Sequence, residues 1–308
     1  MYSGSGVHHI GVGVDDYNTM KSFYQDTLGF ENVWEEFLGV ESPMEDVFRG
    51  SSHRFDGIML GQPAGGIIVE LIRMIEPRPR PIRNLSRYGD IGVNKLTVAV
   101  SDTELFFRQA AKTINFCTEP QTITVQGMGT CSFVYARDPE GNLLEFISGD
   151  ALPVHERPCC CRLGVGVTDL ERSVSFYRKH VGFDSVIVDI NEQYSGLVDG
   201  ISGFSGTQVR CCVLANEKGG GMLELCELLA PRGRSIPFNA HWGDFGCIEL
   251  AVECDDLHAL ARYYDEQEVE WLHRPCRAFD TAEAELWFMY IRDPDGIPVE
   301  IVSAIPKI

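Results

Sequence analysis

The feature of this sequence that most limits its fold is an internal duplication. The stretch VHHIGVGVDDYNTMKSFYQDTLGF at 7–30 is repeated in large part by CRLGVGVTDLERSVSFYRKHVGF at 161–183. Other segments repeat in the same order: YGDIGVNKLTVAVSD at 88–102 with WGDFGCIELAVECDD at 242–256, and RDPEGNLLEF at 137–146 with RDPDGIPVEI at 292–301. Repeats of this extent indicate two tandem halves with one fold, residues 1–152 and 153–308.

Each half divides again, because HIGVGVDD at 9–16 has the same pattern as KLTVAVSD at 95–102. The pattern predicts a strand, an aspartate that caps a helix, and an amphipathic helix. In the first copy Gly29 should end this helix. Three strand-like runs follow, near 32–37, 54–60 and 66–73, bounded by glycine and proline. The chain is therefore predicted to be an α+β protein of four βαβββ modules, two in each half, that pair into cupped mixed sheets.

The charge of the chain excludes several partners. The formal net charge is −19 and the sequence pI is about 4.8, so nucleic acid and anionic membrane surfaces should be repelled. We find no long apolar segment and no signal peptide. We expect a cytoplasmic monomer or homodimer that acts on a small molecule.

The module order and its motifs resemble the vicinal oxygen chelate superfamily. The resemblance rests on an H-I-G-x-x-V first strand, an F-Y-x-x-x-x-G-F helix end, V-E-L closing one module and D-P-x-G-N-x-x-E-F closing the next. The superfamily includes glyoxalase I, epimerases, extradiol dioxygenases and metal-free bleomycin-binding proteins. The resemblance implies the fold, but one scaffold hosts many reactions.

The resemblance also implies where metal ligands would lie, at the start of the first strand and within the last strand of each module. The first-strand positions are His9, Lys95, Arg162 and Glu249. The last-strand positions are Glu70, Glu145, Glu224 and Glu300. All eight are ionisable in otherwise apolar runs, where an unpaired charge is costly.

Two pairings of the modules are open at this stage. If each half forms its own cup, as in two-domain dioxygenases, each cup mixes cations with carboxylates. If the first module pairs with the fourth, as in fused glyoxalase I proteins, one cup holds His9, Glu70, Glu249 and Glu300. The other cup then holds Lys95, Glu145, Arg162 and Glu224. We favour the crossed pairing, because three acids need a cation or protons to neutralise them, while two cations and two acids neutralise one another.

His9, Glu70, Glu249 and Glu300 are accordingly the predicted metal ligands. One histidine with three carboxylates suits Mn²⁺, Fe²⁺, Ni²⁺ or Zn²⁺. Simpler interpretations are that His9 is an ordinary buried histidine and that Glu300 is a surface carboxylate. Because side chains alternate along a strand, His8 is predicted to face away from His9.

The resemblance to glyoxalase I implies a metal-dependent isomerase, epimerase or lyase acting on a small α-oxygenated carbonyl compound. A metal-stabilised enediolate would form, with Glu300 as the base and Glu70 as its partner across the cup. Glu249 departs from the glyoxalase pattern, which leaves the metal and the reaction open. The alternatives are a ring-cleaving dioxygenase, which would need histidines where Arg162 and Glu249 stand, and a metal-free binding protein of the bleomycin-resistance kind.

An arginine-rich connector follows the first module, RMIEPRPRPIRNLSR at 73–87. Proline makes this segment stiff and non-helical. Arg78, Arg80 and Arg83 are candidates for binding a substrate carboxylate or phosphate at the cup rim. A solvated connector whose arginines pair with surface acids is the alternative.

Overall fold

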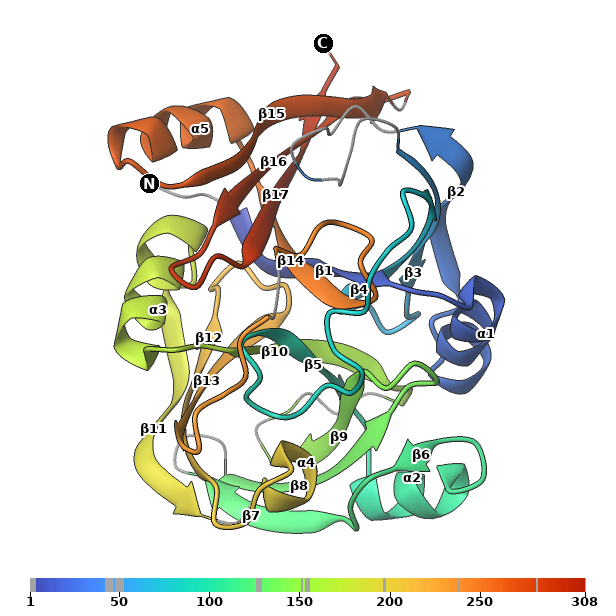
Figure 1. The fold of residues 1–308 in the computed structure, drawn as a ribbon, viewed down its shortest axis with the longest axis vertical. Coiled ribbons are helices and arrows are strands. Elements are labelled where there is room, and N and C mark those ends of the chain that lie inside the picture. The colour runs from blue at the N-terminus through green and yellow to red at the C-terminus, as the bar shows by residue number, and fades with distance from the viewer. Residues whose placement is uncertain are drawn as a thin grey trace.

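A computed structural model describes residues 4–41, 47, 53–125, 129–150, 152, 156–195, 198–236, 239–280 and 282–307. The structure is strand-rich, with short helices that pack against two sheets on the outside of the molecule (Figure 1). The strands are β1 (Gly4–Gly13), β2 (Asn32–Glu41), β3 (Arg54–Gly61), β4 (Ile68–Glu76), β5 (Gly92–Ala99), β6 (Asn115–Phe116), β7 (Gln121–Val125), β8 (Gly129–Arg137), β9 (Leu143–Gly149), β10 (Cys159–Gly166), β11 (Ser185–Ser195), β12 (Gln208–Ala215), β13 (Met222–Ala230), β14 (Gly246–Cys254), β15 (Trp271–Asp280), β16 (Ala284–Arg292) and β17 (Pro298–Pro306). The helices are α1 (Tyr17–Ser22), α2 (Thr103–Ala110), α3 (Leu170–Phe176), α4 (Asp199–Ser202) and α5 (Leu257–Glu266).

The four module helices begin at the predicted aspartates. The side chain of each aspartate accepts the backbone N–H three residues later, with N···O distances of 3.0, 2.8, 2.9 and 2.8 Å for Asp16, Asp102, Asp169 and Asp256. Helices α1 and α3 each continue as a π-helical turn, at Phe23–Thr27 and Tyr177–Val181. Within the described residues, every helix is too short or too polar to cross a membrane.

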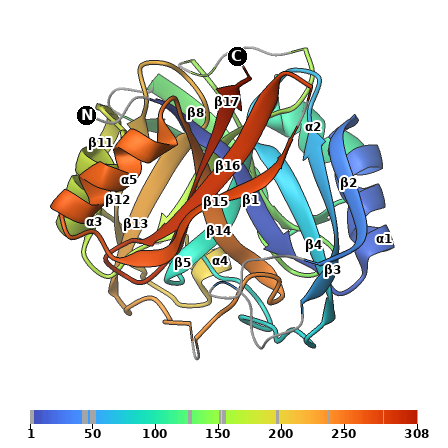
Figure 2. The ribbon, with the colours of Figure 1, turned by 90° about the horizontal axis from the view of Figure 1, so that it is seen from above.

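The strand order confirms the α+β fold and the crossed pairing of modules. Sheet A has the order β15-β16-β17-β14-β1-β4-β3-β2 and so joins the first module to the fourth. Sheet B has the order β11-β12-β13-β10-β5-β9-β8-β6, with β7 on β8, and joins the second module to the third. In each sheet the first strands of two modules pair antiparallel, β1 with β14 and β10 with β5. Figure 2 shows the continuous curved array of sheet A from above.

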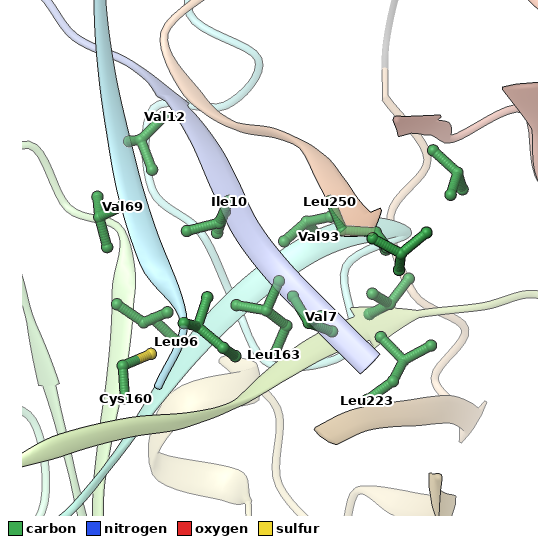
Figure 3. Packing of buried hydrophobic residues seen from close by; sticks show 14 of the residues in the cluster. Val7, Ile10, Val12, Val69, Val93, Leu96, Cys160, Leu163, Leu223 and Leu250 are labelled. Atoms are coloured by element: carbon green, nitrogen blue, oxygen red, sulfur yellow. The ribbon is translucent and has the colours of Figure 1, made fainter. Parts of the chain in front are cut away.

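One large apolar core lies between the two sheets. Val7 and Ile10 of β1 lie close to Leu96 of β5 and Leu163 of β10 across this interface (Figure 3). Ile10 and Leu163 have no exposed surface, so the faces of the sheets that meet are dry. Two smaller apolar clusters cover the opposite faces. We call these opposite faces cup A, on sheet A, and cup B, on sheet B.

Candidate functional site

Cup A brings together all four predicted metal ligands, two from each end of the chain. Gly11 of β1 lies opposite Glu70 of β4 on one side and opposite Glu249 of β14 on the other. His9 lies opposite Ala251, which in turn pairs with Glu300 of β17. The registers of four adjacent strands therefore place one imidazole and three carboxylates on a single patch.

His9 lies between two of the three carboxylates of this patch. Nε2 of His9 lies 2.8 Å from Oε2 of Glu300 and 3.8 Å from Oε2 of Glu70. His9, Glu249 and Glu300 are 3%, 1% and 7% exposed. Three acids in a buried patch with one imidazole leave an excess of negative charge.

The excess charge perturbs the acid–base behaviour of the patch. Burial raises the pKa of Glu70 to about 7, with His9 opposing and the Glu300 carboxylate adding to the shift. The pKa of Glu249 is raised well above its usual range by burial and by Glu300 and Glu70. Burial alone would lower the pKa of His9, but the adjacent Glu300 and Glu70 carboxylates outweigh it and the net shift is upward. Burial and mutual repulsion therefore favour the protonated forms of Glu70 and Glu249 when no cation is present.

The donor set fits a divalent cation in its chemistry. Oε2 of Glu300 is buried and accepts no well-aligned hydrogen bond, since its approach to His9 is close but poorly directed. A buried oxygen with unused lone pairs is a natural cation ligand. The side chains do not yet enclose an ion position: within the described residues, no three His, Cys, Asp or Glu side chains are arranged as a metal site. Binding an ion would require the His9–Glu300 contact to open.

Two aromatic residues in cup A were not predicted from the sequence. Nε1–H of Trp242 donates a hydrogen bond to Oε1 of Glu249 at 2.7 Å. Tyr290 of β16 lies beside Glu249 and Glu300, and burial together with these carboxylates raises its pKa well above the usual range. The duplication carried a signal for both residues, because Trp242 repeats Tyr88 and Tyr290 repeats Tyr135.

The prediction for His8 was wrong. Nδ1 of His8 lies 2.8 Å from Nδ1 of His9, so the two rings touch. The register with β14 passes from Val7↔Val252 directly to His9↔Ala251, which leaves His8 as the extra residue of a β-bulge and breaks the alternation. Burial, helped by the neighbouring His9, lowers the pKa of His8 to about 3. His8 is therefore a neutral hydrogen-bond partner that orients the His9 ring.

Gly11 is required by the site rather than by its backbone conformation. A Cβ atom at Gly11 would lie 2.6 Å from Oε1 of Glu249. In cup B the equivalent Gly164 makes room for Lys95 in the same way, at 3.0 Å. The first glycine of the repeated G-V-G-V motif therefore gives space to the first-strand side chain of the facing module.

Cup B holds the other four predicted side chains as a closed ion network. Nζ of Lys95 lies 3.0 Å from Oε2 of Glu145 and 2.8 Å from Oε1 of Glu224. Arg162 contacts the same two carboxylates at 2.8 and 3.1 Å. Burial opposes ionisation of Glu145, but the Lys95 and Arg162 charges outweigh it and hold its pKa well below the usual range. Thr97 donates a further hydrogen bond to Glu145 at 2.8 Å.

The three predicted substrate-binding arginines are placed differently from one another. Arg78 lines a small crevice together with Trp242, at the edge of cup A. Arg80 donates its backbone N–H to Asp244 and its guanidinium to Asn239 O. The guanidinium of Arg83 is held by the carbonyls of Ile91 and Arg234, between the two connectors that cross from sheet to sheet. Contact between these arginines and a substrate stays a prediction.

The walls of cup A are apolar and include aromatic rings. Their residues surround the acidic patch: Phe55, Ile72, Met74, Ile248 and Phe288, with Phe37 and Leu272 partly buried beside them. A crevice of about 30 Å³ lies beside Glu249 and Trp242, which is room for about one water molecule.

Comparisons with known proteins agree with this architecture. A sequence model of the Glyoxalase/Bleomycin resistance protein/Dioxygenase superfamily matches residues 6–146 and 162–301, once in each half. Among solved structures, glyoxalase I from Zea mays aligns at 18% identity over 96% of this chain and 92% of that chain, with a TM-score of 0.58. A proposed dioxygenase from Bacillus subtilis aligns at 15% identity over 99% and 87% of the two chains, with a TM-score of 0.55. The comparison with curated proteins gave no match.

Proposed function

The chain belongs to the Glyoxalase/Bleomycin resistance protein/Dioxygenase superfamily, and from that premise we propose that cup A is a metal-dependent active site of the glyoxalase type. His9, Glu70, Glu249 and Glu300 would hold one divalent ion, Mn²⁺, Fe²⁺, Ni²⁺ or Zn²⁺. The reaction would be an isomerisation, epimerisation or lyase cleavage of a small α-oxygenated carbonyl compound.

The observation that carries this proposal is the charge imbalance of cup A. Its three carboxylates share one imidazole, that of His9, as their potential counter-charge. In cup B the same glutamate positions are matched by Lys95 and Arg162. A buried acidic patch is costly unless a cation offsets it. In cup A, His9 and Glu249 stand at the positions where cup B has Arg162 and Lys95, the cations that pair with its acids.

The chain's own groups suit proton transfer next to a carbonyl. A divalent ion in this patch would supply Lewis acidity toward a carbonyl and its neighbouring oxygen. Glu300 is our candidate base, because its carboxylate lies beside His9 and Tyr290 and its Oε2 accepts no well-aligned hydrogen bond. Glu70, which lies across His9, would be the partner that exchanges a proton with the substrate. Burial of the patch excludes bulk water from both groups.

The aromatic walls of cup A favour a substrate with an apolar substituent beside the reacting carbonyl. Phe55 and Phe288 are 7% exposed and flank the acidic patch, where a charged group would lose its hydration without a partner. The two other family activities fit less well. A ring-cleaving dioxygenase would take its ligands from the third and fourth modules, which lie in different sheets. A metal-free binding protein would not need the acids of cup A.

Metal analysis of the purified protein tests the proposal. We expect about one transition metal ion per chain in wild type and none in His9→Ala. The matched control is Arg162→Lys, which changes the equivalent position of cup B while keeping its charge, and it should retain the ion.

Three outcomes would contradict the proposal. Absence of metal from wild-type protein after exposure to Mn²⁺, Fe²⁺, Ni²⁺ and Zn²⁺ would favour the metal-free binding protein. Loss of metal from Arg162→Lys but not from His9→Ala would place the site in cup B. Oxygen uptake with a catechol by the metal-loaded protein would favour the dioxygenase. If metal is bound as expected, a screen of keto acids, ketoses and acyl-CoA esters should then identify the substrate.

A further inference from the structure

The turn His241–Asp244 enters cup A from the connector between the third and fourth modules. It carries Trp242, which is 7% exposed and packs its ring edge to face on Phe55, with ring centroids 4.9 Å apart. Nε1–H of Trp242 donates to Oε1 of Glu249 at 2.7 Å. An indole N–H can only donate, so this contact fixes one oxygen of Glu249 as an acceptor.

Hydrogen bonds and two glycines define the conformation and position of this turn. The carboxylate of Asp244 accepts the N–H groups of Arg80 and His241 at 2.7 and 2.9 Å. Gly243 adopts φ +80°, which few other residues tolerate. A Cβ atom at Gly13 would overlap the carbonyl oxygen of Asp244. The second glycine of the G-V-G-V motif therefore lets the turn approach β1.

Cup B repeats this device. Tyr88 occupies the position of Trp242, and its hydroxyl donates to Oε1 of Glu224 at 3.1 Å. Asp90 binds the guanidinium of Arg234 in the other connector, and Gly166 makes room for the Asp90 carbonyl. Each cup thus receives one aromatic donor from an aromatic-Gly-Asp turn. The donor binds the first-strand Glu249 in cup A and the last-strand Glu224 in cup B.

We propose that Trp242 is a positioning residue for the metal site: its indole N–H binds Oε1 of Glu249 and so fixes the orientation in which this carboxylate meets the ion. This inference rests on the proposed function. The two substitutions Trp242→Phe and Trp242→Tyr separate the donor from the ring, because both keep an aromatic ring against Phe55 and only tyrosine can donate. The tyrosine is the residue that cup B uses at this position.

Binding of Zn²⁺ and Co²⁺ to metal-stripped protein, measured by calorimetry or chelator competition, tests the proposal. Trp242→Phe should weaken the affinity by about 10- to 100-fold, the usual effect of losing a partner that orients a ligand. Trp242→Tyr should recover part of that loss, because its hydroxyl can donate to a carboxylate of the cup. The visible spectrum of bound Co²⁺, which reports ligand geometry, should change in Trp242→Phe and return toward wild type in Trp242→Tyr. Thermal unfolding of both variants checks that they are folded.

If either variant fails to fold, NMR spectra of the wild-type protein can test the inference. The chain has four tryptophans, and the indole N–H signal of Trp242 in NMR spectra should exchange slowly with deuterium and shift when Zn²⁺ is added. The signal of Trp34, 67% exposed, should do neither. Equal metal affinity of wild type and both variants, or an indole signal that ignores Zn²⁺, would overturn the inference while leaving the proposed function intact. Wild-type protein that binds no metal would overturn both.

Discussion

Cups A and B occupy equivalent places in the two sheets and differ at their first-strand positions. Each has two last-strand glutamates, an aromatic donor from a connector turn and a tyrosine on the neighbouring strand. Cup A adds His9 and Glu249, whereas cup B adds Arg162 and Lys95. Two side chains therefore decide whether a cup neutralises itself or needs an external cation. Comparing the cups separates what the scaffold needs from what the chemistry needs.

The largest expected effect comes from breaking the network of cup B. Lys95→Met should lower the free energy of unfolding by about 3–5 kcal/mol, because it leaves buried carboxylates with one cation instead of two. The matched change in cup A, Glu249→Gln, should cost less than about 1 kcal/mol in metal-free protein, since the amide oxygen can still accept from Trp242. Urea denaturation followed by circular dichroism, with a chelator present, measures both. Equal costs in the two cups would show that the charge balance does not distinguish them.

The pH dependence of stability should differ in sign between the cups. The pKa of Glu70 is about 7 in the folded protein and about 4.5 in the unfolded chain, so the unfolded state loses its proton first and stability falls as pH rises through this window. His9, with its pKa raised, stabilises the fold below pH about 6.5 and loses that contribution as pH rises further. Glu145, with its pKa lowered, stabilises the fold above pH about 4.5 and loses this contribution as pH falls.

Glu70→Gln tests the sign in cup A. The stability of this variant relative to metal-free wild type should increase between pH 4.5 and 7, by up to about 3 kcal/mol. Unfolding curves at a series of pH values measure the difference. Parallel curves for the two proteins would contradict the raised pKa of Glu70.

The smallest expected effect concerns the glycines that make room for first-strand side chains. Gly11→Ala should cost about 1 kcal/mol, because the carboxylate end of Glu249 can turn away, but it should weaken metal binding. Gly164→Ala presses on the stem of Lys95, which is fixed by two ion pairs, and should cost about 1–3 kcal/mol with no effect on metal binding. Chemical denaturation and metal titration of the two variants measure these effects. If the glycines serve only the backbone, Gly11→Ala should not weaken metal binding.

The sequence predicts the fold well because duplication and charge are both visible in it. The repeated motifs predict the modules, and the aspartate caps at Asp16 and Asp169 confirm where the helices begin. The crossed pairing followed from a charge argument, since only that pairing separates Lys95 and Arg162 from His9 and Glu249. Sheet order confirms this argument.

Contacts between residues that are far apart in the sequence were not predicted. The bulge at His8 comes from the register of two strands far apart in sequence, and period-2 alternation cannot show it. The contact of Trp242 with Glu249 depends on how a connector crosses between sheets. Arg83 lies within that connector packing, held by the carbonyl of Arg234 from the other half, which a search for anion-binding residues does not anticipate.

Because β1 pairs with β14, the strands of sheet A come from the two ends of the chain and the strands of sheet B come from its middle. Every strand of sheet B lies between β4 and β14 in sequence, so its partners are all available before the fourth module leaves the ribosome. Strand β1 is synthesised first, but its partner β14 is synthesised only with the last quarter of the chain. Contacts this distant in sequence are slow to close. The acidic patch therefore cannot be complete until the fourth module has been synthesised, whereas all residues of the cup B ion network precede that module in the chain.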